Sequence, residues 1–169
     1  MGEDSGAWVH LALKGEVYVD FGVAPVPIPI RVEVLLGFPR DDFQLSPELM
    51  AREIVAYVEE RPDEYETYRP LLAELAMSVG TAAGMSGDHA TAAWWLAQSA
   101  RARPDDARVL KNYALALVRN GRAREALEVC SRIRALPLGS REFVFLFSVE
   151  AECRRAIDGG GGGSREPSI

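Results

Sequence analysis

Hydrophobic and polar residues alternate with a period of two in the first part of the chain. Residues 9–13, 17–21 and 30–34 each place an apolar side chain at every second position, and Lys14-Gly15 could close a hairpin between the first two runs. This period is typical of half-buried β-strands. We therefore expect a small antiparallel β-sheet over residues 7–39, with three strands. A sheet of this size is marginal alone and must pack on another element.

The pattern changes to a helical period after residue 45. Ser46, Pro47 and Glu48 form a typical start of a helix, with an N-cap residue, a proline at the first helical position and an early acid. Apolar residues then recur at intervals of three and four, which places them on one helical face. Because Pro62-Asp63 follows, the sequence predicts a connecting helix over 46–61.

A longer period appears in the second half of the chain. When Ala73 is aligned with Ala107, the register holds for 34 positions. Each unit consists of a helical pattern, a short glycine turn, a second helical pattern and a proline, and the second proline comes one residue early. A third helix is predicted over 141–157. The matched positions include Ala82 with Ala116, Gly87 with Gly121, and Ala92 with Ala126.

This register resembles the tetratricopeptide repeat (TPR) family, whose unit is two antiparallel helices in 34 residues. The resemblance covers about residues 73–157, and its two spaced units span about 73–140. It implies a mainly α fold (α+β overall), in which a TPR-like antiparallel helix-hairpin array over 70–157 follows the small sheet. Small residues stand where the family's helices meet closely, namely Gly80, Ala92, Ala114 and Ala126. The chain departs from the family pattern at Ala76, Ala83, Cys130 and Ile133.

The resemblance also implies a concave groove lined by the first helix of each unit. Asn112 stands where peptide-binding members commonly carry asparagine, which implies that it anchors a peptide backbone, with Lys111 contacting a side chain or carboxylate. The alternative is that Asn112 is an ordinary exposed helix residue. A clamp for a C-terminal carboxylate is not expected, because its flanking basic residues are missing. The groove-facing residues would be Met77, Ser78 and Thr81, then Lys111, Asn112 and Leu115, then Phe145, Leu146 and Val149.

The last predicted helix is apolar around most of its circumference. Such a helix is buried or meets a partner, whereas the end of a solenoid is normally polar outside. The N-terminal sheet, a second copy of the chain or a partner helix could cover it, and we favour a partner or dimer contact. The apolar side chains are Phe143, Phe145, Leu146, Phe147 and Val149.

Charge is distributed unevenly along the 169 residues, whose net charge is −6. Residues 1–98 carry a net charge of −10 and residues 99–169 a net charge of +4. The overall acidity argues against a nucleic-acid partner. The basic half could attract an acidic ligand, or its arginines could simply lie on solvated helix faces.

Catalytic and metal-binding patterns are weak in this sequence. His10 and His89 are far apart, and Cys130 and Cys153 fall at packing positions, where reduced thiols are expected. The acidic run from Glu59 to Glu66 lacks the spacing of a calcium loop. We expect no enzyme activity, no cofactor and no metal. We also expect no membrane-spanning segment, a cytoplasmic location and a flexible glycine-rich tail over 158–169.

These features together predict a protein–protein interaction module. It would act as an adaptor, scaffold or chaperone-like protein that binds a peptide or helix in the groove of a short TPR-like array. The alternative is a non-catalytic oligomerisation or assembly subunit of a larger complex, such as a secretion system or compartment. The expected partner is a protein or peptide, and a homo-oligomer is the other option.

Overall fold

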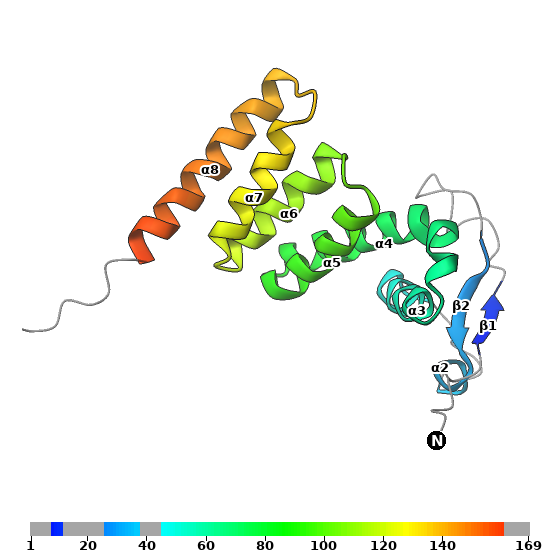
Figure 1. Ribbon diagram of the computed structural model, residues 1–169. Helices are drawn as coiled ribbons and strands as arrows, with labels where there is room; N and C mark the ends of the chain where they lie inside the picture. The colour runs from blue at the N-terminus through cyan, green and yellow to red at the C-terminus, as the bar shows by residue number, and fades with distance from the viewer. Residues whose placement is uncertain (1–7, 12–25, 38–44, 161–169) are drawn as a thin grey trace, which may run out of the picture. The chain divides into compact units, whose positions relative to one another are not determined.

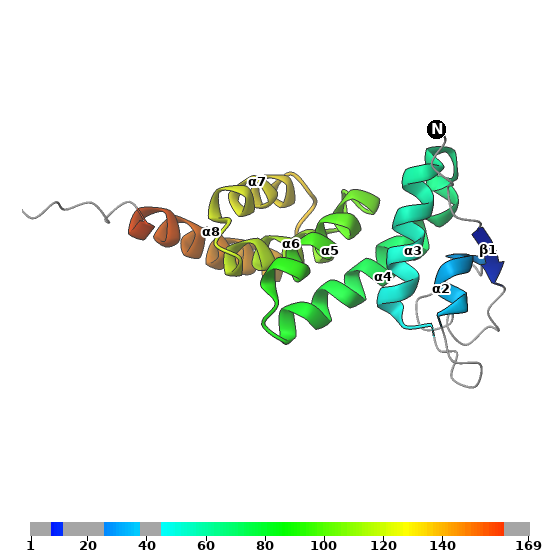
Figure 2. The same ribbon diagram turned by 90° about the horizontal axis from the view of Figure 1, so that it is seen from below.

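The computed structural model describes residues 8–11, 26–37 and 45–160. The described chain is mainly α-helical with one small antiparallel sheet, as the sequence predicted (Figures 1 and 2). It divides into two compact units, the first ending at Val79 and the second beginning at Gly80. The long helix α4 (Tyr65–Met85) contributes to both units.

The sheet of the first unit has two described strands, β1 (Trp8–Leu11) and β2 (Ile28–Arg31), which pair antiparallel. The strand predicted over 30–34 stops at Arg31, and the chain continues as the short helix α2 (Val32–Leu36). Arg31, the last residue of β2, pairs with Trp8 of β1. The predicted run 17–21 and the Lys14-Gly15 turn lie outside the described residues.

Helix α3 (Pro47–Glu60) lies within the range predicted for the connecting helix. The side chain of Ser46 caps it by accepting a hydrogen bond from the Leu49 N–H at 3.1 Å. A short 3-10 helix, Pro62–Glu64, follows, and α4 then begins five residues before Pro70, where the repeat domain was expected to start. Pro70 therefore lies inside a helix, where it removes one backbone donor.

The sheet is attached to α3 by a buried carboxylate and by aromatic rings. Glu53 is 2% exposed and accepts hydrogen bonds from the Arg31 N–H at 2.9 Å and from its guanidinium at 3.0 Å. Trp8 packs edge-on against Tyr57, with ring centroids 5.1 Å apart, and Tyr57 packs in the same way on Tyr68 of α4. The sheet thus gains the packing partner that it requires.

The second unit is a series of antiparallel helices that follows the end of α4. They are α5 (His89–Ala102), α6 (Ala107–Arg119), α7 (Ala123–Arg134) and α8 (Ser140–Gly160), each in contact with the next, and α6 also contacts α8. Helices α4 and α6 end 34 positions apart, as α5 and α7 begin 34 positions apart. The turns contain Gly87 and Gly121 with φ of 88° and 74°, a conformation that favours glycine.

Small residues allow the helices of the second unit to approach closely. A Cβ atom on Gly80 of α4 would lie 2.7 Å from Cγ of Leu96 on α5, so a larger residue does not fit without movement. Ala92 of α5, Ala114 of α6 and Ala126 of α7 are all fully buried. These are the positions at which the sequence pattern placed small residues.

Candidate functional site

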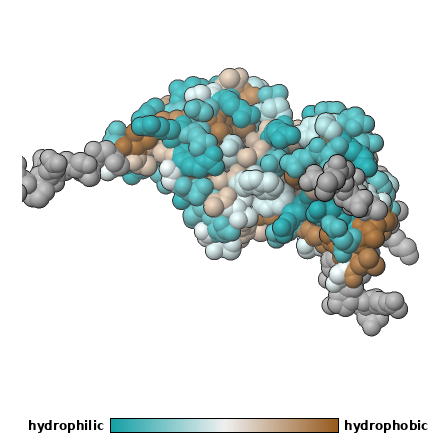
Figure 3. All heavy atoms as spheres, turned by 60° about the horizontal axis from the view of Figure 1, so that its bottom comes forward, coloured by the Kyte–Doolittle hydropathy of each residue, from teal (hydrophilic) through white to brown (hydrophobic). Residues whose placement is uncertain are grey.

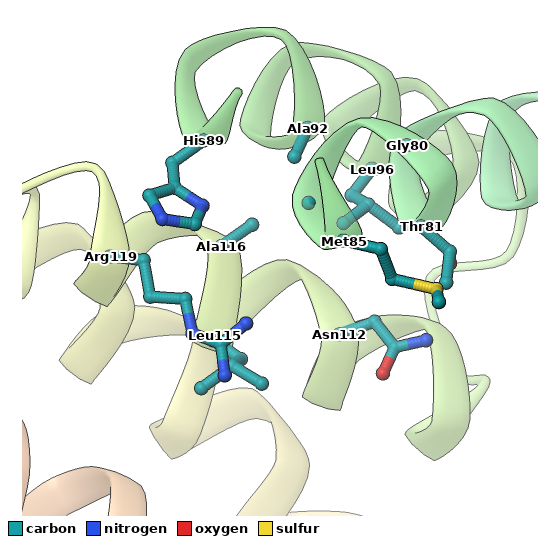
Figure 4. A pocket seen from close by; sticks show the side chains of 11 residues that line it. Gly80, Thr81, Met85, His89, Ala92, Leu96, Asn112, Leu115, Ala116 and Arg119 are labelled. Atoms are coloured by element: carbon teal, nitrogen blue, oxygen red, sulfur yellow. The ribbon is translucent and has the colours of Figure 1, made fainter. Parts of the chain in front are cut away.

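The ends of three helices meet at one place in the second unit. Because α5 and α6 are antiparallel and joined by a short connection, the C-terminal end of α6 returns to the N-terminal end of α5. The turn around Gly87 brings the end of α4 to the same place. A cavity of about 100 Å³ lies there (Figure 4). It is lined by Gly80, Thr81, Gly84, Met85, His89, Ala92, Leu96, Asn112, Leu115, Ala116 and Arg119.

The cavity combines apolar walls with polar groups. Its aliphatic lining includes Leu96 from α5 and Leu115 from α6. In Figure 4, His89 and Arg119 lie towards one end, whereas Asn112 and Thr81 lie towards the other. An apolar pocket with a few placed polar groups is the usual form of a ligand site.

Two glycines of α4 stand in the cavity lining where α4 packs against α5. A Cβ on Gly80 would collide with Leu96. A Cβ on Gly84 would make an ordinary contact with Ala92 at 3.6 Å. Both positions therefore serve the packing of α4 on α5 beside the cavity.

His89 carries an unsatisfied polar atom in this lining. Its Nδ1 is buried, and no described residue forms a hydrogen bond with it. Buried polar atoms normally have a partner, because an unpaired one loses its hydrogen bond to water. The neighbouring carboxylate of Asp88 instead accepts a hydrogen bond from the Thr91 N–H at 3.0 Å, and the pKa of Asp88 is lowered by hydrogen bonding to the Thr91 side chain and, next, to this N–H.

Arg119 is the charged member of the cavity lining. Its side chain is exposed, and it forms no ion pair with any residue in the described ranges. The other lining residues contain no carboxylate. The charge of the lining is therefore positive and is not neutralised by another lining residue.

The structure brings only some of the predicted groove residues together. Thr81, Asn112 and Leu115 line the cavity. Lys111 instead lies over the ring of Phe145 on α8, with Nζ 5.3 Å from the ring centroid, a cation–π contact. Ser78 is exposed on α4.

Three other predicted groove residues lie elsewhere. Leu146 and Val149 of α8 are 1% and 3% exposed. They pack in the interior of the unit, so the structure corrects the expectation that they face an open groove. The reason is that α8 packs on both α6 and α7, which covers this face. Met77 lies on the part of α4 that belongs to the first unit.

Sequence reasoning missed Met85, His89 and Arg119. A signal for two of them was present, because Met85 follows Thr81 by four positions and Arg119 follows Leu115 by four. Residues four apart lie on the same helical face, so the predicted stripe could have been extended by one turn. The position of His89 depends on how α5 packs, and no local pattern reports it.

The outer side of α8 exposes large apolar side chains, of which the sequence analysis had named Phe143 and Phe147. Phe143, Val144 and Phe147 are 44%, 71% and 62% exposed. Their spacing places them near one another on the helix. This patch, the α8 outer face, is separate from the cavity.

The cysteines and the acidic residues show no reactive arrangement within the described residues. Cys130 and Cys153 are free and buried, and burial raises the pKa of Cys130 to about 12 and also raises that of Cys153. In the same ranges no cluster of three or more histidine, cysteine or acidic side chains could hold a metal ion. No described helix combines the length and the apolar character needed to cross a bilayer.

Comparisons with known proteins add no further assignment. No family model, curated protein or solved structure matches this chain. The chemistry of the cavity therefore carries the functional argument.

Proposed function

We propose that this protein is an interaction module that binds a peptide segment of a protein partner beside helix α6. The observation that carries the proposal is the cavity, in which Thr81, Asn112 and Leu115 come together from two helices. The resemblance to tetratricopeptide repeats implies the same three residues. The module would serve as an adaptor, scaffold or chaperone-like protein.

The size of the cavity supports a peptide ligand. Sites for drug-sized molecules and cofactors usually enclose about 300 to 1,000 Å³, whereas this cavity measures about 100 Å³. It has room for one side chain rather than a whole cofactor. The amide of Asn112 can donate and accept at the same time, which suits the backbone of the segment that supplies that side chain.

We place this activity in the cytoplasm. The support is that both described cysteines are free and buried rather than joined in a disulfide. Reduced thiols are usual in the cytosol, whereas disulfides are usual in oxidising compartments.

A peptide-binding measurement tests the proposal. Peptides are selected from a phage-displayed library on the full chain, and their affinities are measured by fluorescence polarisation. Asn112→Ala should weaken binding about tenfold, the cost of roughly one hydrogen bond at a desolvated site. The combined variant Lys111→Glu and Asn112→Ala should weaken it further. Glu128→Ala, an exposed change on α7 outside the cavity, is the matched control and should leave the affinity unchanged.

The proposal fails if Asn112→Ala and the combined variant bind the selected peptides as tightly as the unaltered chain. Circular dichroism of each variant checks that its helices are intact. A loss in Glu128→Ala equal to that in Asn112→Ala would likewise contradict a site beside α6.

A second candidate function, oligomerisation or assembly within a larger complex, is favoured by the α8 outer face. Exposed apolar side chains that lie together often mark contacts between proteins. Phe143, Val144 and Phe147 would then contact a second copy of the chain. The test of this candidate is a property of the whole molecule and is given in the Discussion.

A further inference from the structure

We propose that the cavity beside α6 takes the acidic side chain of an aspartate or glutamate in the bound peptide. This inference rests on the proposed function and adds the class of ligand. It comes from the charge of the lining, from the unpaired atom of His89 and from the apolar walls, none of which the family resemblance had indicated.

The charge of the lining is the first argument. Arg119 contributes the only charge of fixed sign among the lining residues, and no acidic side chain lies with it. A guanidinium keeps its charge at all ordinary pH values and binds a carboxylate through two parallel hydrogen bonds. A lysine or arginine side chain of a ligand would meet a like charge in a cavity with no acid to offset it.

The second argument is the unsatisfied nitrogen of His89. In the tautomer that carries the proton on Nδ1, this atom is a hydrogen-bond donor. His89 and Arg119 then both contribute hydrogen-bond donors among the residues that line the cavity (Figure 4). A carboxylate can accept both bonds, whereas a ligand amide offers one oxygen and adds two donors of its own.

The third argument separates a side chain from the carboxylate at the end of a peptide. The methylene carbons of glutamate or aspartate would contact Leu96 and Leu115, which wall the cavity. The carboxylate at the C-terminus of a peptide is attached directly to the backbone, so no methylene carbon beside it could contact these leucines. A phosphate is also a poorer match, because phosphopeptides are normally bound by clusters of arginines and this lining has one.

A library of blocked peptides tests this inference. Fluorescein-labelled peptides with acetylated and amidated ends are prepared as pools, each with one residue fixed at one position, and their binding to the full chain is measured by fluorescence polarisation. At one position of the peptide, we expect the pools that fix aspartate or glutamate to bind about ten to a hundred times more tightly than the pools that fix asparagine or glutamine at that position. This range corresponds to a hydrogen bond to a charged group.

Charge reversal assigns the preference to the cavity. Arg119→Glu should remove the preference for acidic pools, and Arg119→Gln should reduce it. Both changes are expected to preserve folding, because Arg119 is exposed and has no ion pair among the described residues. Arg124→Glu, a change of equal charge at an exposed position of α7, is the matched control and should retain the preference.

The outcomes separate this inference from the function on which it rests. If pools bind in a way that depends on Asn112 but show no preference for an acid over its amide, the inference is overturned and the proposed function stands. It is also overturned if Arg119→Glu keeps the preference, or if binding requires a free C-terminus. If no pool binds the unaltered chain, both proposals are wrong.

Discussion

At the scale of single residues, Gly80 sets how closely α4 approaches α5. A Cβ at this position would lie 2.7 Å from Cγ of Leu96 and 3.2 Å from its backbone nitrogen. The leucine side chain could move, but its backbone is fixed in α5. Protein interiors are too closely packed to absorb an added methyl group without cost.

We therefore expect Gly80→Ala to lower the free energy of unfolding by about 1 to 3 kcal/mol, the usual cost of overpacking. Gly84→Ala is the matched control, because it adds the same methyl group to the same helix. Its Cβ would lie 3.6 Å from that of Ala92, an ordinary contact, and alanine favours a helix over glycine by about 0.5 to 1 kcal/mol. Urea-induced unfolding followed by circular dichroism measures both variants. Equal effects of the two substitutions would contradict the close approach at Gly80.

At the scale of the elements, a buried acid joins α7 to α8. Glu150 of α8 is 5% exposed, and its carboxylate accepts hydrogen bonds from Arg134 of α7 and from Arg154 one turn further along α8. Both arginines are more than half exposed, so water screens part of the attraction. The carboxylate itself is removed from water and depends on these partners.

Replacing the carboxylate of Glu150 by an amide should destabilise the second unit. We expect Glu150→Gln to lower the free energy of unfolding by about 1 to 2 kcal/mol, because two charge-assisted hydrogen bonds become weaker. Glu152→Gln, which removes the same charge from an exposed position two residues away, should change it by less than about 0.5 kcal/mol. Urea unfolding is measured for both variants, for Arg134→Gln, and for the double variant that combines Glu150→Gln with Arg134→Gln. If Glu150→Gln has the same effect with and without Arg134→Gln, the two side chains are not coupled.

The ends of the helices show which boundaries of the elements can be predicted from the sequence. The glycine turns and the 34-residue interval were readable, because a turn that needs positive φ restricts the residue types that can occupy it. The start of α4 was not readable, because Pro70 resembles a start signal although it lies inside the helix. The strand predicted for 30–34 stops at Arg31, because the chain continues from Val32 as the helix α2 although the alternation of apolar residues persists.

At the scale of the whole molecule, the α8 outer face decides between a monomeric binding module and an assembling one. Three apolar side chains are exposed there, at 44% to 71%. If the chain assembles through this face, those side chains are buried between copies, and the mean mass rises with concentration. Burial of side chains of this size stabilises a contact by about 1.5 to 3 kcal/mol each.

The second candidate function accordingly predicts self-association that depends on Phe147. Sedimentation equilibrium of the unaltered chain should show a mean mass that rises with concentration, and Phe147→Glu should hold the mass at 18.5 kDa. Arg124→Glu introduces the same residue outside the face and should associate like the unaltered chain. A constant mass of one chain at the highest attainable concentration would exclude this candidate.

The sequence by itself determined the mainly helical character, the small sheet, the glycine turns and the small residues at helix contacts. Each of these depends on local stereochemistry or on side-chain volume, which the order of residues records directly. It also indicated Thr81, Asn112 and Leu115, since a regular interval places equivalent residues on equivalent helix faces.

Only the tertiary structure decided which of the indicated residues are open to a ligand. Leu146 and Val149 share the predicted register of Asn112 and Leu115, yet α6 and α7 cover them. His89 and Arg119 are 30 positions apart in sequence and line the same cavity because antiparallel packing returns the end of α6 to the start of α5. The positive charge and the unpaired nitrogen of the cavity arise from that packing, which no local pattern contains.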